Sequence, residues 1–195
     1  MLSPLPPPAG GISTWTKNIL DYCSDDGRGY NLIHLDTASR LKEITRTDLL
    51  SRWVYGGREF LRIRTELKEN IKNCKPDLIH LVSSASLALI KDYAILYYTE
   101  KKKIPVILHW RFGRIPILAR KKNWEWFLLL RVIKKSNTSI VLDRASLNAL
   151  ENAGLMNICQ IPNPLVNDVE ELMSEKTARK YSRKKGTVLF AGHII

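Results

Sequence analysis

Short apolar runs alternate along this chain with longer stretches in which apolar positions recur at helical spacing. The apolar runs predict strands over residues 2–5 (only the end of a strand), 30–36, 77–82, 104–110, 138–143 and 157–161. The periodic stretches predict helices over residues 11–23, 49–74, 87–101, 121–135 and 145–153. Because strands and helices alternate, we expect an α/β fold with a Rossmann-like, mostly parallel sheet flanked by helices.

Individual residues set the expected limits of these helices. Gly56 and Gly57 predict a break within the long helix over 49–74. Ser84 or a neighbour is expected to cap the helix that follows, and Gly154 to end the helix over 145–153.

The composition changes towards the C-terminus. We expect a first domain over residues 1–165 and a linker over 166–185 that is rich in Lys, Arg and Glu. The apolar run in "GTVLFAG" then predicts, over 186–195, the first strand of a C-terminal domain that the chain leaves incomplete.

The positive net charge of the chain predicts an anionic partner or an anionic surface. The formal net charge is +12, which suits an anionic membrane, nucleic acid or a phosphorylated substrate. Three widely spaced cysteines, Cys23, Cys74 and Cys159, argue against a disulfide framework or a zinc site. The chain shows no signal-peptide pattern and no apolar run of the roughly 18–20 residues that a membrane span needs. We expect a cytoplasmic protein, able to lie at the inner face of the membrane as a peripheral protein.

The positive charge is concentrated in residues 111–135, which contain eight Lys or Arg and one Glu. Basic ends flank an aromatic and apolar middle, "WEWFLLL", as in helices that lie in a membrane interface. A core helix with solvated ends fits the same pattern and stays open. Nucleic acid is not expected, because the aromatic residues sit in one helix and form no stacking platform. The residues predicted to face the membrane are Arg120, Lys121, Lys122, Trp124, Trp126 and Phe127.

Ligands of open parallel sheets bind beyond the carboxyl ends of the strands, so the strand ends hold the candidate site residues. Gly10 and Gly11 follow the first strand and precede a helix, where backbone N–H groups can approach an anion. A tight turn without a ligand remains the alternative, because the loop matches neither known phosphate-binding glycine motif. His109 and Arg111 end another strand, where they offer a hydrogen-bonding ring and a fixed charge. For His34 and His80, packing within strands is the favoured interpretation.

Together, five segments resemble the N-terminal domain of retaining GT-B glycosyltransferases of family 4: "SPLPPPAGGIS", "KPDLIHLVSS", "IPVILHW", "SIVLDRASLNAL" and "ICQIPNPL". In addition, "GTVLFAGHII" resembles the strand that opens the C-terminal, donor-binding domain of that family. The resemblance implies two Rossmann-like domains that face each other across a cleft. It also implies sugar transfer from a nucleotide-sugar donor to a saccharide or lipid-linked acceptor, with retention and without an obligatory metal or other cofactor.

The resemblance assigns expected roles to single residues. Gly10 and Gly11 would approach the diphosphate and sugar of the donor, and His109 would face the donor sugar, with Arg111 beside it. Asn163 matches the residue at the exit from the first domain. Gly192 matches a glycine whose loop faces the diphosphate, whereas His193 stands where an arginine is commoner.

The family's acidic pair and nucleoside pocket, both in the C-terminal domain, are missing from this chain. We therefore expect it to have little or no transferase activity alone, within an enzyme of polysaccharide or glycolipid synthesis. Two other functions stay open: a non-catalytic Rossmann-like module for an anionic ligand or protein partner, and, less favoured, a nucleic-acid binder.

Overall fold

The computed structural model describes residues 1–7, 10–24, 29, 31–38 and 49–163, with only the backbone of 49–56. Met1–Pro162 form one compact unit, and a second unit begins at Asn163. The expected linker, the expected strand over 186–195, Gly192 and His193 lie outside the described residues.

The elements of the first unit alternate as expected, except that two helices instead of one lie between the fourth and fifth strands. They are β1 (Leu2–Ser3), α1 (Gly11–Cys23), β2 (Leu35–Asp36), α2 (Leu49–Cys74), β3 (Ile79–Ser83), α3 (Ala88–Lys101), β4 (Val106–Trp110), α4 (Ile115–Lys121), α5 (Trp124–Lys135), β5 (Thr138–Val141), α6 (Arg144–Glu151) and β6 (Ile158–Gln160).

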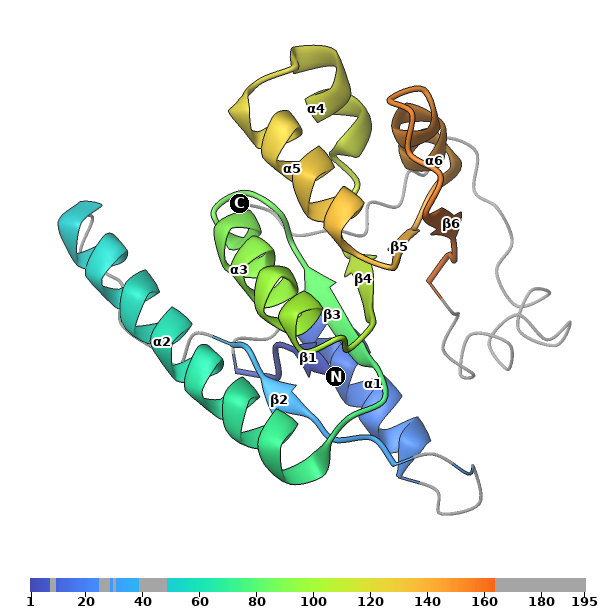
Figure 1. Ribbon diagram of the computed structural model, residues 1–195. Helices are drawn as coiled ribbons and strands as arrows, with labels where there is room; N and C mark the ends of the chain where they lie inside the picture. Colours follow the sequence, from blue (N-terminus) through green and yellow to red (C-terminus); the bar gives the residue numbers. More distant parts are fainter. Residues whose placement is uncertain (8–9, 25–28, 30, 39–48, 164–195) are drawn as a thin grey trace, which may run out of the picture. The chain divides into compact units, whose positions relative to one another are not determined.

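The strands form one parallel sheet in the order β2-β1-β3-β4-β5-β6, which confirms the predicted α/β class (Figure 1). The chain leaves β1 in one direction along the sheet to reach β2, and every later connection runs the other way. Because crossovers between parallel strands are right-handed, this reversal places α1 on one face and the later helices on the other. The reversal makes the space between the carboxyl ends of β1 and β3 the topological switch point of the sheet.

Alternation along the strands gives the two faces of the sheet different chemistry. On the face of α3 and α5, Leu81, Leu108 and Trp110 are fully buried and belong to the main hydrophobic core. His80 and His109 alternate with these residues and therefore point to the other face, where Trp15 of α1 contacts both rings. The main hydrophobic core thus lies on the face of the sheet that α3 and α5 cover, and the face beside α1 carries the polar groups.

Several expected boundaries are wrong. The strand expected over 30–36 is shorter and covers only Leu35–Asp36, as β2. The break expected at Gly56 and Gly57 does not occur, because α2 continues through both residues. A glycine within a helix costs only about 1 kcal/mol of stability, and packing of the rest of α2 can offset this cost. Among the described residues, no side chain caps α3, whose N-cap residue is Leu87.

The helix expected over 121–135 is α5, which begins only at Trp124, and α4 precedes it in a segment for which the sequence pattern predicts no helix. Lys122 adopts the left-handed conformation with φ 46°, which ends α4. Asn123 then caps α5 by accepting a hydrogen bond from the Trp126 N–H at 3.1 Å. Lys122 and Asn123 thus form a tight corner between α4 and α5.

Candidate functional site

A cavity of about 460 Å³ lies at the switch point, where the carboxyl ends of β1, β2 and β3 meet the first turns of α1 and α3. Its lining residues are Pro4, Gly10, Gly11, Ile12, Ser13, Thr37, Ala38, Val82, Ser84, Ala88 and Lys91. This is the position at which open parallel sheets bind their ligands. The structure therefore brings the predicted glycine loop into a cavity of the expected kind.

Gly10 and Gly11 are not required by the backbone or by packing within the chain. Gly10 is extended, with φ −172°, and caps α1 without a side chain. A Cβ on Gly11 would meet no atom within 4 Å, and one on Gly10 only the Ser13 Oγ at 3.8 Å. Open space before the first turn of α1 leaves room for a ligand to approach the positive end of the helix dipole.

Two carboxylates near this cavity, Asp36 and Asp92, form hydrogen bonds or ion pairs with other groups of the chain. Asp36, at the end of β2, accepts hydrogen bonds from the backbone N–H groups of Leu5 (3.0 Å) and Ala38 (2.8 Å). Asp92 is fully buried and accepts a hydrogen bond from Ser83 Oγ at 2.5 Å. Lys91, which lines the cavity, lies 2.7 Å from the other oxygen of Asp92. The cavity therefore has a cation on its wall and no carboxylate among its lining residues.

A cluster of four side chains lies one helical turn from Gly11. The rings of His80 and His109 are stacked, with His80 Nε2 and His109 Nδ1 3.3 Å apart and the ring planes at 6°. The edge of Trp15 lies against His109, with ring centroids 5.1 Å apart, and the Arg111 guanidinium lies 4.4 Å from the Trp15 ring centroid. Trp15 follows Gly11 by four positions, so α1 connects this cluster to the cavity.

One ring nitrogen of His109 is buried without a hydrogen-bond partner among the residues that the structure describes. His109 is 5% exposed, and this nitrogen is Nε2. A buried imidazole nitrogen without a partner is costly, so a ligand oxygen at this nitrogen would be stabilising. A hydrogen bond between His109 Nδ1 and His80 Nε2, in which the tautomers decide the donor, fixes the ring orientation of His109.

Burial and the neighbouring charges keep both histidines neutral. Desolvation is the main cause that lowers the pKa of His80 to about 4, and the Arg111 cation adds to it. Desolvation, then His80 and Arg111, lower the pKa of His109 to about 3. Burial also lowers the pKa of Arg111. At neutral pH the cluster offers uncharged imidazoles beside one guanidinium.

The structure thus connects Gly10, Gly11, His109 and Arg111 through α1. Asn163 is exposed and belongs to the second unit. The favoured interpretation of His80 as a packing residue misses its contact with His109, because only the register of β3 and β4 places the two rings side by side. Trp15 and Lys91 were also missed, although the spacing of Trp15 from Gly11 is a visible signal.

Of the residues predicted to face a membrane, Trp126 is wrongly assigned. It is 5% exposed and belongs to the hydrophobic core. Trp124 and Phe127 are more than half exposed, at 57% and 52%. Arg120, Lys121 and Lys122 are also exposed.

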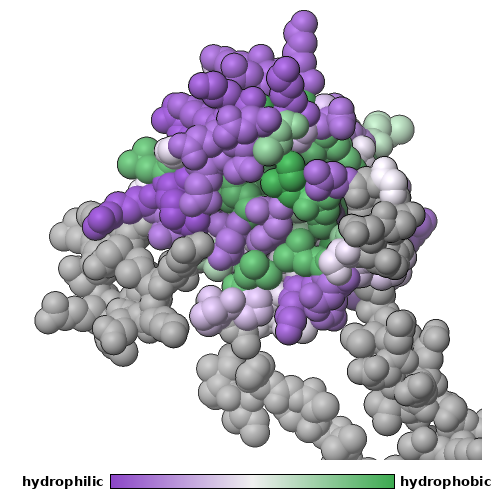
Figure 2. Space-filling view, turned by 90° about the horizontal axis from the view of Figure 1, so that it is seen from below, coloured by the Kyte–Doolittle hydropathy of each residue, from purple (hydrophilic) through white to green (hydrophobic). Residues whose placement is uncertain are grey.

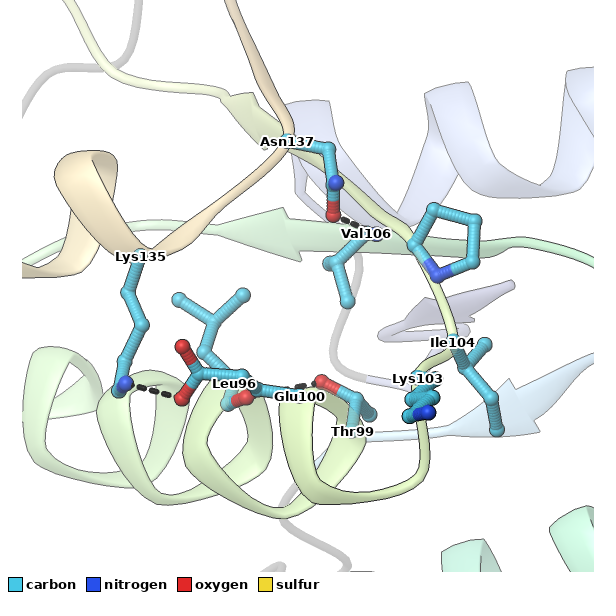
Figure 3. A pocket seen from close by; sticks show the side chains of 9 residues that line it. Leu96, Thr99, Glu100, Lys103, Ile104, Val106, Lys135 and Asn137 are labelled. Carbon is cyan, nitrogen blue, oxygen red and sulfur yellow. Dashed lines mark hydrogen bonds and ion pairs between the residues drawn. The ribbon is translucent and has the colours of Figure 1, made fainter.

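A second cavity, of about 250 Å³, lies at the opposite edge of the sheet, before β4 begins (Figure 3). Lys135 and Glu100 form an ion pair across it, and the Asn137 side chain accepts a hydrogen bond from the Val106 N–H at 2.8 Å. These groups satisfy one another, and the cavity holds none of the candidate residues. We therefore place the candidate site at the switch point.

Within the described ranges, no group of three or more His, Cys, Asp or Glu side chains could hold a metal ion. Among the same residues, no helix combines the length and the apolar character needed to cross a membrane. Comparisons with protein-family models, curated proteins and solved structures gave no match.

Proposed function

We propose that this chain is the acceptor-side domain of a retaining GT-B glycosyltransferase that uses a nucleotide-sugar donor. The observation that carries the proposal is the switch-point cavity, which opens in front of Gly11 and is connected through α1 to His109 and Arg111. The resemblance of the sequence segments supports it independently. Saccharides or lipid-linked saccharides are the proposed acceptors.

The chemistry of sugar transfer gives these groups distinct tasks. Departure of the nucleoside diphosphate leaves negative charge on the phosphate and oxocarbenium character on the sugar. The positive end of α1 and the Arg111 guanidinium favour the phosphate side. His109 is neutral, so the ring would not repel the developing positive charge on the sugar.

A non-catalytic module for a small anion is the second candidate, because the α1 N-terminus faces the cavity and Lys91, which is paired with Asp92, lies on its wall. The two candidates differ in what they recognise. An acceptor-side transferase domain also recognises the sugar part of its ligands, whereas an anion module binds inorganic pyrophosphate equally well.

Binding to the whole chain, followed by ¹H–¹⁵N NMR, tests the proposal without requiring turnover. We expect UDP- or GDP-linked sugars to shift the amide signals of Gly10 and Gly11 and the indole signal of Trp15, but not that of Trp124. Equal shifts with pyrophosphate would favour the anion module. Absence of these shifts with every nucleotide-sugar and saccharide tried would contradict a ligand site at the switch point.

Gly11→Ala tests the site with little risk to the fold. The new methyl group meets no atom of the described residues within 4 Å, so we expect unchanged or slightly higher stability. It would occupy the space in front of α1, and we expect nucleotide-sugar affinity to fall roughly tenfold, which corresponds to about 1.4 kcal/mol. Gly57→Ala is the matched control, because that Cβ also meets open space and Gly57 lines no part of the cavity. Equal affinities for both variants would contradict the role of Gly11.

A further inference from the structure

The helical corner between α4 and α5 exposes large apolar side chains next to consecutive cations. Ile117 is 47% exposed, Trp124 57% and Phe127 52%. Between them lie three exposed cations in a row, at the end of α4. We call this surface the docking corner: Ile117, Arg120, Lys121, Lys122, Trp124 and Phe127.

The one carboxylate of this segment is turned away from the docking corner. Glu125 is 7% exposed, and its Oε1 accepts a hydrogen bond from the Ser86 N–H at 2.9 Å. The same oxygen lies 3.8 Å from the Arg114 guanidinium. The docking corner therefore combines three positive charges with apolar side chains and includes no negative charge.

A groove of about 800 Å³ continues the docking corner between α4, α5 and α6. Arg120, Lys122 and Phe127 of the docking corner line it, together with small apolar residues such as Ala119 and Ala149. The groove thus extends the apolar part of the surface and keeps cations beside it.

We propose that the docking corner binds the surface of an anionic lipid bilayer. Aromatic rings such as Trp124 and Phe127 suit the headgroup level, and lysines and arginines beside them attract anionic headgroups. Nucleic acid would satisfy the cations but would leave the exposed apolar side chains without apolar contacts. A bilayer satisfies both, because headgroups and acyl chains lie within a few ångströms of each other.

The position of the docking corner gives the bound chain an orientation. In a parallel sheet each crossover helix begins at the carboxyl edge, so α5 starts at the same edge as the switch-point cavity. The Glu125 side chain joins the start of α5 to Ser86, in the loop before α3, and Ser84 of this loop lines the cavity. A chain docked in this way holds the cavity close to the bilayer. This step rests on the proposed function and favours a lipid-linked acceptor, whereas the docking itself does not depend on it.

Flotation of the whole chain with vesicles tests the docking. We expect binding to vesicles with one third phosphatidylglycerol in phosphatidylcholine, weak binding to phosphatidylcholine alone, and weaker binding as salt is raised. The triple variant Arg120→Gln, Lys121→Gln, Lys122→Gln removes the cations, and we expect roughly tenfold to hundredfold weaker binding. Trp124→Ala with Phe127→Ala removes only exposed apolar side chains, and we expect several-fold weaker binding.

On the side seen from below, hydrophilic residues surround a smaller hydrophobic area (Figure 2). Because the net charge of +12 includes exposed lysines outside the docking corner, such as Lys101, Lys102 and Lys103, the loss of total charge must be controlled. Lys101→Gln, Lys102→Gln, Lys103→Gln removes three exposed cations at the other edge of the sheet, where α3 ends. For the apolar pair, Tyr22→Ala with Met156→Ala is the control, at 58% and 93% exposure. We expect both controls to bind like the wild type.

Several outcomes would overturn the docking proposal. The first is failure of the wild type to bind anionic vesicles. The second is an equal loss of vesicle binding in the docking-corner variants and in the control variants. The third is binding to double-stranded DNA that is as tight as binding to vesicles and is weakened as much by the docking-corner substitutions. Circular dichroism of each variant separates loss of binding from loss of folding. Because flotation needs no donor and no transfer, its failure leaves the proposed transferase function untouched, and the NMR test leaves the docking untouched.

Discussion

His109 illustrates how a residue's surroundings decide its chemistry. In water an imidazole is partly charged near neutral pH, but burial against Trp15 and the nearby Arg111 keep this ring neutral. Its contact with His80 orients the ring, and its buried Nε2 has no hydrogen-bond partner among the residues that the structure describes. The residue at the strand end could be identified from the sequence, whereas its charge state and its partner could not.

The two buried histidines make stability depend on pH. Their pKa values in the folded chain, about 4 for His80 and about 3 for His109, lie below the ordinary value of 6.5. Their contribution is fully present above pH 6.5 and is lost as the pH falls towards the folded values, because the unfolded chain then binds more protons. We expect the free energy of unfolding to fall by about 1–3 kcal/mol between about pH 7 and pH 5.

Urea unfolding of His80→Gln with His109→Gln, compared with the wild type, measures this contribution. The double variant should show the shallower dependence on pH, since His34 titrates in both proteins and its effect cancels. If the double variant does not fold, the two single variants are measured in its place. Parallel curves for all of these proteins would contradict the assignment.

At the scale of elements, the corner between α4 and α5 depends on two adjacent residues. Lys122 turns left-handed and ends α4, and Asn123 caps α5, so α5 begins later than expected and follows a helix that was not expected. Trp124 and Trp126 both lie in α5, yet Trp124 is exposed and Trp126 is buried. Helical periodicity predicts that the two rings differ in direction, but the core that receives Trp126 comes from other parts of the chain.

Asn123→Ala tests the cap. The Asn123 side chain accepts the Trp126 N–H at 3.1 Å, and its loss should lower the free energy of unfolding by about 1 kcal/mol. Asn152→Ala, at an exposed position after α6, is the control and should change it by less than about 0.5 kcal/mol. Urea unfolding measures both. Equal stabilities of the two variants would show that the cap does not stabilise the corner.

At the scale of the whole first unit, the sheet is stabilised mainly through one face. The core on the side of α3 and α5 contains the fully buried residues of β3 and β4, while the other face carries the histidines. This division lets the α1 side hold polar groups for a ligand without weakening the main core. It also concentrates the stability of the unit in the central strands.

Leu108→Ala tests where that stability lies. Leu108 is 0% exposed in β4, and we expect its truncation to cost about 2–5 kcal/mol, because it leaves a cavity in the core. Leu61→Ala, 56% exposed on α2, should change stability by less than about 0.5 kcal/mol. Thermal and urea unfolding measure both variants. A small loss for Leu108→Ala would contradict a one-sided core.

The sequence by itself determined the order of the strands and of every helix except α4, the α/β class, and the strand ends at which His109 lies and after which Gly10 and Gly11 follow. These features are local, because periodicity and turn residues act over a few positions. Only the tertiary structure decided that β1 lies beside β3, that His80 stacks on His109, and that Glu125 turns inward while Trp124 stays exposed. Register, strand order and burial depend on contacts between residues distant in the chain, and no local pattern encodes those contacts.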